Sequence, residues 1–131
     1  MTLRVASAAD GHAPPPPFDA TLDSLSPGYL EENAWGVPHL DAQSWRYYLS
    51  AFLEHAARNR DNGASMAVGQ FLFSLRPDGR TPYRFAALGT DERGAVIAVL
   101  DDLAFGAGSA WVEDARSALE EYWGPGASYE A

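Results

Sequence analysis

The segment from Asp41 to Arg58 reads DAQSWRYYLSAFLEHAAR and decides the fold. Asp41 is a good N-cap residue, because its carboxylate accepts a hydrogen bond from the free amides of a first helical turn. After it, apolar residues recur three and four positions apart and share one face of a helix. These residues are Trp45, Tyr48, Leu49, Phe52 and Ala56. The pattern predicts a long amphipathic helix that ends at about Arg58, before the Asn- and Gly-containing stretch 59–63.

Upstream and downstream of this helix, the sequence predicts further short elements. Ser26-Pro27 is typical of a helix start, with an N-cap residue followed by a first-turn proline, and Asp19 is expected to cap a short turn before it. The stretch 37–40 is expected to be extended, because the residue before Pro38 avoids the helical conformation. Residues 64–75 are apolar nearly all round, which fits a buried helix or a buried strand, and we favour the helix.

The sequence pattern in the last third of the chain predicts two more helices. After a turn at residues 76–82 and an extended link at residues 83–88, Thr90 is expected to cap a helix that reaches about Phe105. Ser109 is expected to cap the last helix, which ends at the Gly-Pro-Gly stretch beginning at residue 124. The predicted fold class is therefore mainly α, with four to five helices.

A run of four prolines, residues 14–17, cannot enter a helix or a central strand. We therefore expect residues 1–17 to form an extended, Pro-rich N-terminal tail. Residues 18–124 are predicted to form one helical globular domain, and residues 125–131 a C-terminal tail. The length of 131 residues fits this organisation, because it is the usual size of a single domain.

Composition excludes several classes of protein. The chain has no cysteine, which excludes disulfides, thiol catalysis and cysteine-ligated zinc. Its apolar runs are shorter than a membrane span and it has no secretion signal, so we expect a cytoplasmic protein that contacts no membrane. Asp and Glu number 18 against nine arginines and no lysine, for a net charge of −9. Nucleic-acid binding is disfavoured, because it requires Lys and Arg to neutralise phosphates.

The negative charge is concentrated near the C-terminus. Residues 85–131 hold nine acidic residues and two arginines, a net charge of −7. The leading interpretation is a non-catalytic interaction domain that contacts a basic partner protein, as immunity proteins do when they block a toxin, with association accelerated by electrostatic steering. The residues predicted to contact the partner are Asp101, Asp102, Glu113, Asp114, Glu120, Glu121 and Trp123.

Two alternatives stay open. Residues 42–84 hold six arginines and three acidic residues, a net charge of +3, which suits a small enzyme or a ligand-binding protein for an anionic small molecule. The residues of that predicted site are Arg46, Tyr47, His55 and Arg84. The other alternative is a structural homodimer joined through residues 64–75, and the sequence leaves the oligomeric state open.

No metal site, cofactor or catalytic residue is predicted. Asp41 and His55 stand fourteen positions apart on the predicted helix, roughly 20 Å at its rise per residue, so they cannot bind one ion together with His39. The acidic pairs along the chain are adjacent in sequence, and adjacent helical side chains diverge by about 100°. Because they diverge, such pairs do not form a convergent acid/base site.

Two segments resemble a family of small bacterial proteins of unknown function. Residues 39–53 read HLDAQSWRYYLSAFL, and residues 84–92 read RFAALGTDE. Members of that family carry an aromatic-Arg-Tyr-Tyr-Leu-Pro-Ala-Phe-like stretch and then an Arg-Phe-x-x-Leu-Thr-like helix entry. Ser50 stands in place of the proline, and Gly89 is interposed before Thr90. The resemblance covers about residues 35–105 and implies a mainly helical bacterial domain without assigned catalytic residues.

Overall fold

The computed structural model describes residues 1–77 and 81–127, and every regular element in them is a helix. This confirms the predicted mainly α fold. The described part of the chain forms seven α-helices, five of them with seven residues or more, where the sequence predicts four to five helices. The elements are α1 (Leu3–Asp10), α2 (Pro27–Glu32), the 3₁₀-helix η1 (Ala34–His39), α3 (Ala42–Arg58), α4 (Met66–Ser74), α5 (Thr81–Ala86), α6 (Thr90–Phe105), α7 (Val112–Ala118) and the π-helix η2 (Leu119–Trp123).

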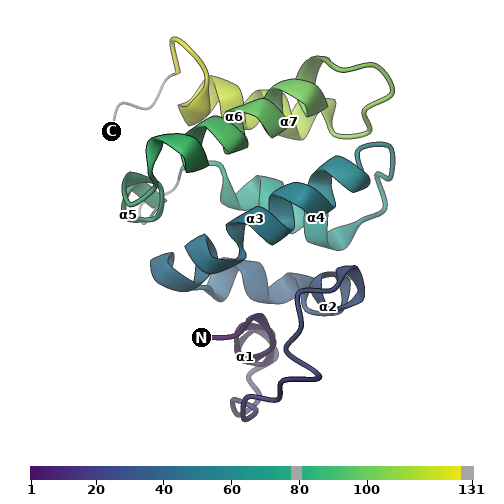
Figure 1. Ribbon diagram of the computed structural model, residues 1–131, viewed down its shortest axis with the longest axis vertical. Coiled ribbons are helices and arrows are strands. Elements are labelled where there is room, and N and C mark those ends of the chain that lie inside the picture. The colour runs from purple at the N-terminus through teal and green to yellow at the C-terminus, as the bar shows by residue number, and fades with distance from the viewer. Residues whose placement is uncertain (78–80, 128–131) are drawn as a thin grey trace.

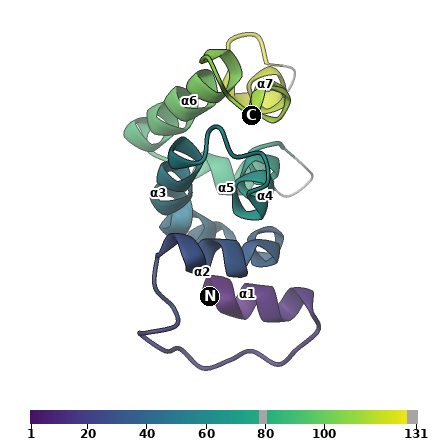
Figure 2. The same ribbon diagram turned by 90° about the vertical axis from the view of Figure 1, so that its right-hand side faces the viewer.

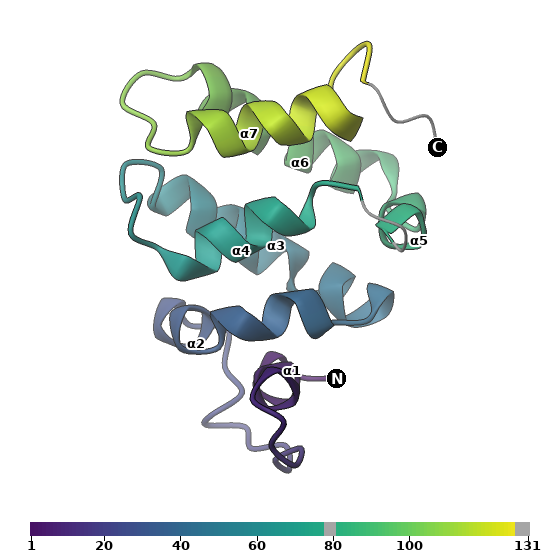
Figure 3. The same ribbon diagram turned by 180° about the vertical axis from the view of Figure 1, so that it is seen from behind.

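The helices are stacked in layers along the long axis of the molecule (Figure 1). α1 lies at one end and packs on η1, and η1 packs in turn on α4. The pair α3–α4 forms the middle of the stack. The pair α6–α7 forms the other end, with α6 over α3 and α7 over α4 (Figure 3). A long linker, residues 11–26, connects α1 to α2 around the outside of the stack (Figure 2).

The decisive helix α3 forms as predicted. Asp41 is its N-cap, and its Oδ1 atom accepts a hydrogen bond from the Ser44 amide at 2.7 Å. The apolar stripe of α3, including Trp45 and Phe52, is buried in the middle of the stack. α3 contacts α4, α5 and α6, so this one helix packs against several other elements of the fold.

Residues 66–74 form helix α4, which confirms the favoured alternative for the segment 64–75. The hydroxyl of Ser65 caps α4 by accepting a hydrogen bond from the Val68 amide at 3.2 Å. Phe71 and Leu72 are buried, and the Phe71 ring stacks on Phe52 of α3 with their centroids 5.2 Å apart. α4 packs against η1, α3 and α7, which buries most of its apolar side chains, while Met66 and Phe73 stay exposed.

The prediction of a tail is wrong for residues 3–10, which form helix α1. Thr2 caps this helix through a hydrogen bond from the Val5 amide at 3.1 Å, and Leu3 and Ala6 are completely buried. α1 approaches η1 at Gly36, where an added Cβ atom would lie 2.6 Å from the Ser7 amide nitrogen. The helix therefore depends on a close backbone approach, which local sequence does not reveal. Residues 13–19, which include the four prolines, form neither helix nor strand.

Two stretches predicted to be extended are helical instead. Residues 37–40 overlap η1, which contains Pro38. A 3₁₀-helix tolerates this proline, because its bonds run from Gly36 to Asn33 and from Leu40 to Val37 and none needs a donor at position 38. The predicted link 83–88 overlaps α5.

The start of each of the last two helices differs from the prediction. Gly89, and not Thr90, is the N-cap of α6, and its amide donates to Glu92 Oε1 at 3.0 Å. α7 begins at Val112, three residues after the predicted cap Ser109. The Ser109 hydroxyl accepts a hydrogen bond from the Trp111 amide, so it supports the loop before the helix. Within residues 1–77 and 81–127, none of the helices combines the length and the apolar character that crossing a membrane requires.

Candidate functional site

The predicted acidic contact residues gather in the layer formed by α6, α7 and η2, at the far end of the stack from α1 (Figure 2). Most of their carboxylates are exposed to solvent. The exposed members are Asp101, Asp102, Glu113, Asp114 and Glu120, and Glu121 is half-buried. We call this layer the acidic end layer.

Three arginines from the middle layer bind carboxylates of the acidic end layer. Arg60 Nε lies 2.9 Å from Asp102 Oδ2, and Arg76 Nη2 lies 3.1 Å from Glu121 Oε1. The third pair is Arg46 with Glu92 on α6. These ion pairs neutralise three of the arginines in residues 42–84, and they link the two layers at their rims.

Four of the predicted contact carboxylates have no such partner. Asp101, Glu113, Asp114 and Glu120 form no ion pair with any residue in the described ranges. Glu113 and Asp114 lie in the first turn of α7, where negative charge stabilises the helix dipole. The surplus negative charge therefore faces solvent.

An exposed aromatic ring, which the sequence analysis missed, lies beside two of these carboxylates, Asp101 and Glu120. Phe105, the last residue of α6, is 68% exposed and stands one helical turn after Asp101. It lines a shallow hollow with Arg116, Leu119 and Glu120, and the Arg116 guanidinium lies 5.5 Å from its ring centroid. Phe105 lies outside the set of buried apolar residues of α6, and this position in the sequence pattern could have indicated that its ring is exposed. Exposed aromatic residues are frequent anchors of protein interfaces.

The assignment of Trp123 to the contact surface is wrong. Its side chain is only 5% exposed, and its indole nitrogen donates to the Leu75 carbonyl at 2.7 Å. The ring packs against Phe85 and Tyr122, with centroid distances of 4.9 and 5.0 Å. Trp123 therefore belongs to the core that joins α5 and η2.

The residues predicted to bind an anionic molecule lie in separate places. Arg46 is bound to Glu92 through two hydrogen bonds of 2.9 and 2.6 Å, which raise the pKa of Arg46 and lower that of Glu92. Arg84 donates to the Leu40 carbonyl at 2.8 Å and covers a tryptophan ring. Tyr47 lines a hollow at the start of α3, whereas His55 lines another between α2 and α3. The four side chains do not converge on one pocket.

His55 belongs to a buried polar cluster that joins α2, α3 and α4. Its Nε2 atom lies 2.6 Å from Glu31 Oε2, and the Ser65 hydroxyl donates to the same oxygen. Burial opposes ionisation of Glu31, but the hydrogen bonds from Ser65 and His55 outweigh it and lower the pKa of Glu31. The other ring nitrogen faces the Asn59 amide group at 3.4 Å.

The geometry of this cluster suits support and not nucleophilic catalysis. A catalytic serine requires a base within hydrogen-bond reach of its hydroxyl. In this cluster the carboxylate of Glu31 stands between Ser65 and His55, so the imidazole faces the carboxylate instead of the hydroxyl. Each polar group is held by another group of the cluster.

The histidines also have separate partners. His39 Nε2 lies 3.0 Å from Asp10 Oδ1, at the end of α1, whereas His55 is bound to Glu31. No group of three His, Asp or Glu side chains in the described part of the chain is arranged to hold a metal ion.

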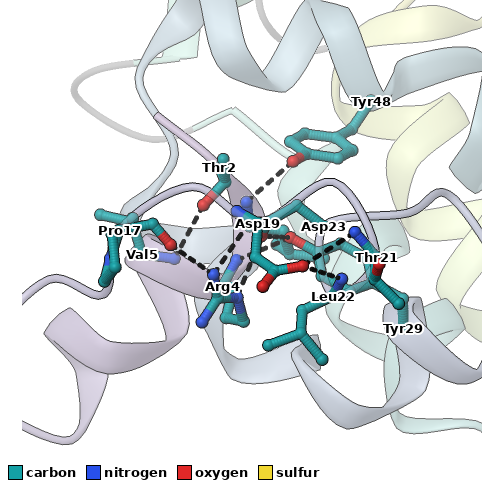
Figure 4. A network of polar contacts seen from close by, with 11 residues as sticks. Thr2, Arg4, Val5, Pro17, Asp19, Thr21, Leu22, Asp23, Tyr29 and Tyr48 are labelled. Carbon is teal, nitrogen blue, oxygen red and sulfur yellow. Dashed lines mark hydrogen bonds and ion pairs between the residues drawn. The ribbon is translucent and has the colours of Figure 1, made fainter.

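A second polar network, also missed by the sequence analysis, fixes the linker to the rest of the molecule (Figure 4). Arg4 donates to both carboxylate oxygens of Asp23, at 3.1 and 2.9 Å, and the Tyr29 hydroxyl donates to Asp23 Oδ1 at 3.0 Å. The Leu3 amide donates to the Tyr48 hydroxyl at 2.9 Å. The hydrogen bonds from Arg4 are the main reason why the pKa of Asp23 is lowered to about 2. Arg4 is the sole basic residue among positions 1–41, and this isolation was the signal for its role.

Comparison with known proteins gives one match. The search of curated proteins and the search of solved structures found none. The model of a family of unknown function, DUF6714, matches residues 1–127, a longer stretch than the resemblance over residues 35–105 implies. The match includes α1 as well as the acidic end layer. On this evidence the chain belongs to the family of unknown function DUF6714.

Proposed function

We propose that this chain is a non-catalytic interaction domain whose acidic end layer binds a basic partner protein, in the manner of an immunity protein. One observation carries the proposal: exposed carboxylates without an ion-pair partner in the described ranges share one layer with an exposed phenyl ring. The carboxylates are those of Asp101, Glu113, Asp114 and Glu120, and the ring is that of Phe105.

The charge distribution of the folded protein supports this proposal. Arginines of the middle layer neutralise Asp102 and Glu121, but the other four predicted contact carboxylates keep their charge at the outer surface. A surface with one sign of charge attracts a partner of the opposite sign over long distance and accelerates the encounter. Phe105 adds apolar area at the same place, which slows dissociation once the partner has docked.

The polar clusters elsewhere support a non-catalytic role. Ser65 and His55, the side chains that could take part in nucleophilic catalysis, both form hydrogen bonds with the Glu31 carboxylate. Arg46 is held by Glu92, so the positive charge predicted to receive an anion is already balanced. A binding function makes use of the features that remain exposed.

The proposal is tested first by capture and then by kinetics. Protein tagged at its C-terminus is used to capture partners from extract of its own cells at low and at raised salt, and bound proteins are identified by mass spectrometry. We expect a stoichiometric basic protein that is retained at low salt and lost at raised salt, because salt screens the attraction. The absence of any basic partner at either salt concentration would contradict the proposal.

A matched pair of double variants then locates the surface. Asp101→Asn with Glu120→Gln removes two charges from the acidic end layer, whereas Glu32→Gln with Asp61→Asn removes two exposed charges elsewhere. We expect the first variant to lower the association rate constant about tenfold at low salt and the second to leave it nearly unchanged. The difference should vanish in about 1 M salt, where the Debye length is about 3 Å. Equal rate constants for the two variants at low salt would show that the partner binds another surface.

A further inference from the structure

A hollow lies between the linker and the start of α3, on the side of the molecule that carries α1. Three aromatic rings and two carboxylates line it, namely those of Phe18, Tyr47, Tyr48, Asp23 and Asp41. The polar network of Figure 4 forms its floor, because Asp23 and Tyr48 belong to both. The hollow is separate from the acidic end layer and from the hollow beside Phe105.

Exposed phenyl rings elsewhere in this protein are covered by arginine. Three phenylalanines are exposed, Phe18, Phe73 and Phe105. The Arg76 guanidinium lies 5.8 Å from the ring centroid of Phe73, and that of Arg116 lies 5.5 Å from the ring centroid of Phe105. Phe18 is 71% exposed and has no cation over its ring in residues 1–77 and 81–127. The fold thus stacks guanidinium groups on two of these rings and leaves the third bare.

The second ring of the hollow is also open to a cation. Tyr47 is 68% exposed, and its ring meets that of Tyr48 edge to face with the centroids 5.1 Å apart. No described arginine lies over it. A tyrosine face attracts a cation electrostatically, and the attraction grows when the cation is partly removed from water.

The two carboxylates of the hollow differ in how far their oxygen atoms are already bound by other residues. Asp23 is already bound by Arg4 and Tyr29, and its side chain is buried. Asp41 is exposed and forms no ion pair with a described residue. Hydrogen bonds from Ser44 lower the pKa of Asp41, so its carboxylate is ionised at neutral pH. The Ser44 amide binds its Oδ1 atom, and the N-terminal ammonium and Arg84 also stabilise its charge, so Asp41 offers an ionised carboxylate to a bound cation beside the hollow.

We propose that this hollow binds the guanidinium group of an arginine side chain from a partner protein. The planar guanidinium stacks on aromatic rings and donates hydrogen bonds to a carboxylate at the same time, which a lysine ammonium cannot do. Phe18 and Tyr47 supply the rings, and Asp41 supplies the carboxylate. The proposal does not depend on the acidic end layer, because it rests on residues at another part of the molecule.

The first test uses a small arginine derivative as the probe. The ¹⁵N-labelled full-length protein is titrated with N-acetyl-arginine methylamide, and amide shifts are followed by NMR. A tag is placed at the C-terminus, because Met1 and Thr2 also line the hollow. We expect shifts at Phe18, Ser44 and Tyr47, and no shifts with the citrulline derivative, which has nearly the same shape without the charge.

Two results of this titration would overturn the proposal. Equal shifts with the citrulline derivative would show that the charge of the guanidinium is not recognised. Arginine-induced shifts confined to Asp101, Phe105 and Glu120 would place the binding at the acidic end layer. The second result contradicts the arginine hollow while leaving the proposed partner surface intact, so the two proposals are distinguished.

Variants then separate the contributions of ring and carboxylate. Tyr47→Ala should weaken binding about two- to fivefold, and Tyr47→Phe should restore it, because the ring face carries the attraction. Asp41→Asn removes the charge but keeps a good helix cap, and it should weaken binding about two- to fivefold. Phe73→Ala removes an equally exposed ring and serves as the control, with no change expected. Unchanged binding by Tyr47→Ala, with the fold verified by circular dichroism, would overturn the proposal.

Discussion

The two ends of the helical stack are attached to its middle by different means. α1 is attached by its buried Leu3 and Ala6 and by a polar network, with backbone amides bound to the hydroxyls of Tyr29 and Tyr48 and with Arg4 bound to Asp23 (Figure 4). The α6–α7 end is attached through aromatic packing around Phe85, with the arginine pairs only at its rim.

This difference teaches what each attachment depends on. Hydrogen bonds depend on distance and direction, so the α1 end is sensitive to small displacements and to pH. Aromatic packing depends on buried area, so the α6–α7 end is sensitive to loss of volume and insensitive to charge. The changes that follow are expected to separate the two.

The largest effect is expected for Phe85→Ala. The ring is completely buried and contacts Trp45, Tyr122 and Trp123 with centroid distances of 5.7, 4.7 and 4.9 Å. Its removal leaves a cavity and should lower the free energy of unfolding by about 3–5 kcal/mol. Urea unfolding followed by tryptophan fluorescence measures the change. A loss below about 1 kcal/mol would mean that packing does not attach this end.

A smaller but still large effect is expected for Gly36→Ala. The new Cβ atom would lie 2.6 and 2.7 Å from backbone atoms of Ser7 and Leu3, so α1 has to move away from η1. We expect a loss of about 2–3 kcal/mol in the free energy of unfolding, together with faster hydrogen exchange in α1. Gly28→Ala is the matched control, because a Cβ atom there meets nothing within 4 Å. Similar losses in both variants would contradict a specific close approach at Gly36.

Asp23→Asn should affect stability at the α1 end in a way that depends on pH. The pKa of Asp23 is about 2 in the folded protein and about 3.9 in an unfolded chain. A lowered folded pKa stabilises the protein above the unfolded pKa, and this contribution is lost as the pH falls through the folded pKa. We expect Asp23→Asn to cost about 1–2 kcal/mol at pH 7. Unfolding measured from pH 7 to pH 2 should show the difference from wild type shrinking below pH 4, and a constant difference would contradict this account.

The smallest effect is expected for Arg60→Ala at the rim of the α6–α7 end. Arg60 pairs with Asp102 and donates to the Ala107 carbonyl at 2.7 Å, but these groups are exposed or only partly buried. Exposed ion pairs contribute little, so the loss should be less than about 1 kcal/mol and should decrease with added salt. Thermal unfolding at two salt concentrations tests this. A loss comparable to that of Phe85→Ala would reverse the assignment of the two attachments.

Sequence reasoning succeeded where a segment carries its own signals. α3 has a cap and a complete apolar stripe, so it was predicted from residues within it, whereas the apolar segment 64–75 fitted a helix or a strand and the helix was only favoured. Sequence reasoning failed where the signal is distant. α1 is stabilised by the close approach at Gly36 and by the hydrogen bond to the Tyr48 hydroxyl. Phe85 of α5 packs against Trp45 and Trp123, which are about forty positions away in either direction.

The candidate surfaces show the same limit. The charge of the acidic end layer is visible in the sequence, but which carboxylates are neutralised depends on Arg60 and Arg76 from another layer. Trp123 was placed at the surface because it precedes a glycine, although it is buried against Phe85. The pairing of Phe18 with Tyr47 at one hollow arises from the path of the linker, which no spacing in the sequence specifies.

The residues that stabilise α1 follow it in the sequence, and this order affects when α1 can fold during protein synthesis. An isolated helix of eight residues is not stable in water, and the surfaces that receive α1 are supplied by η1 and by Tyr48. At a synthesis rate of about 5–20 residues per second, the ribosome adds Tyr48 roughly 2–8 s after the last residue of α1. During that interval Leu3, which is completely buried in the folded protein, has no surface to pack against. α1 is thus synthesised before the surfaces that stabilise it, and it can fold stably only after Tyr48 has been added.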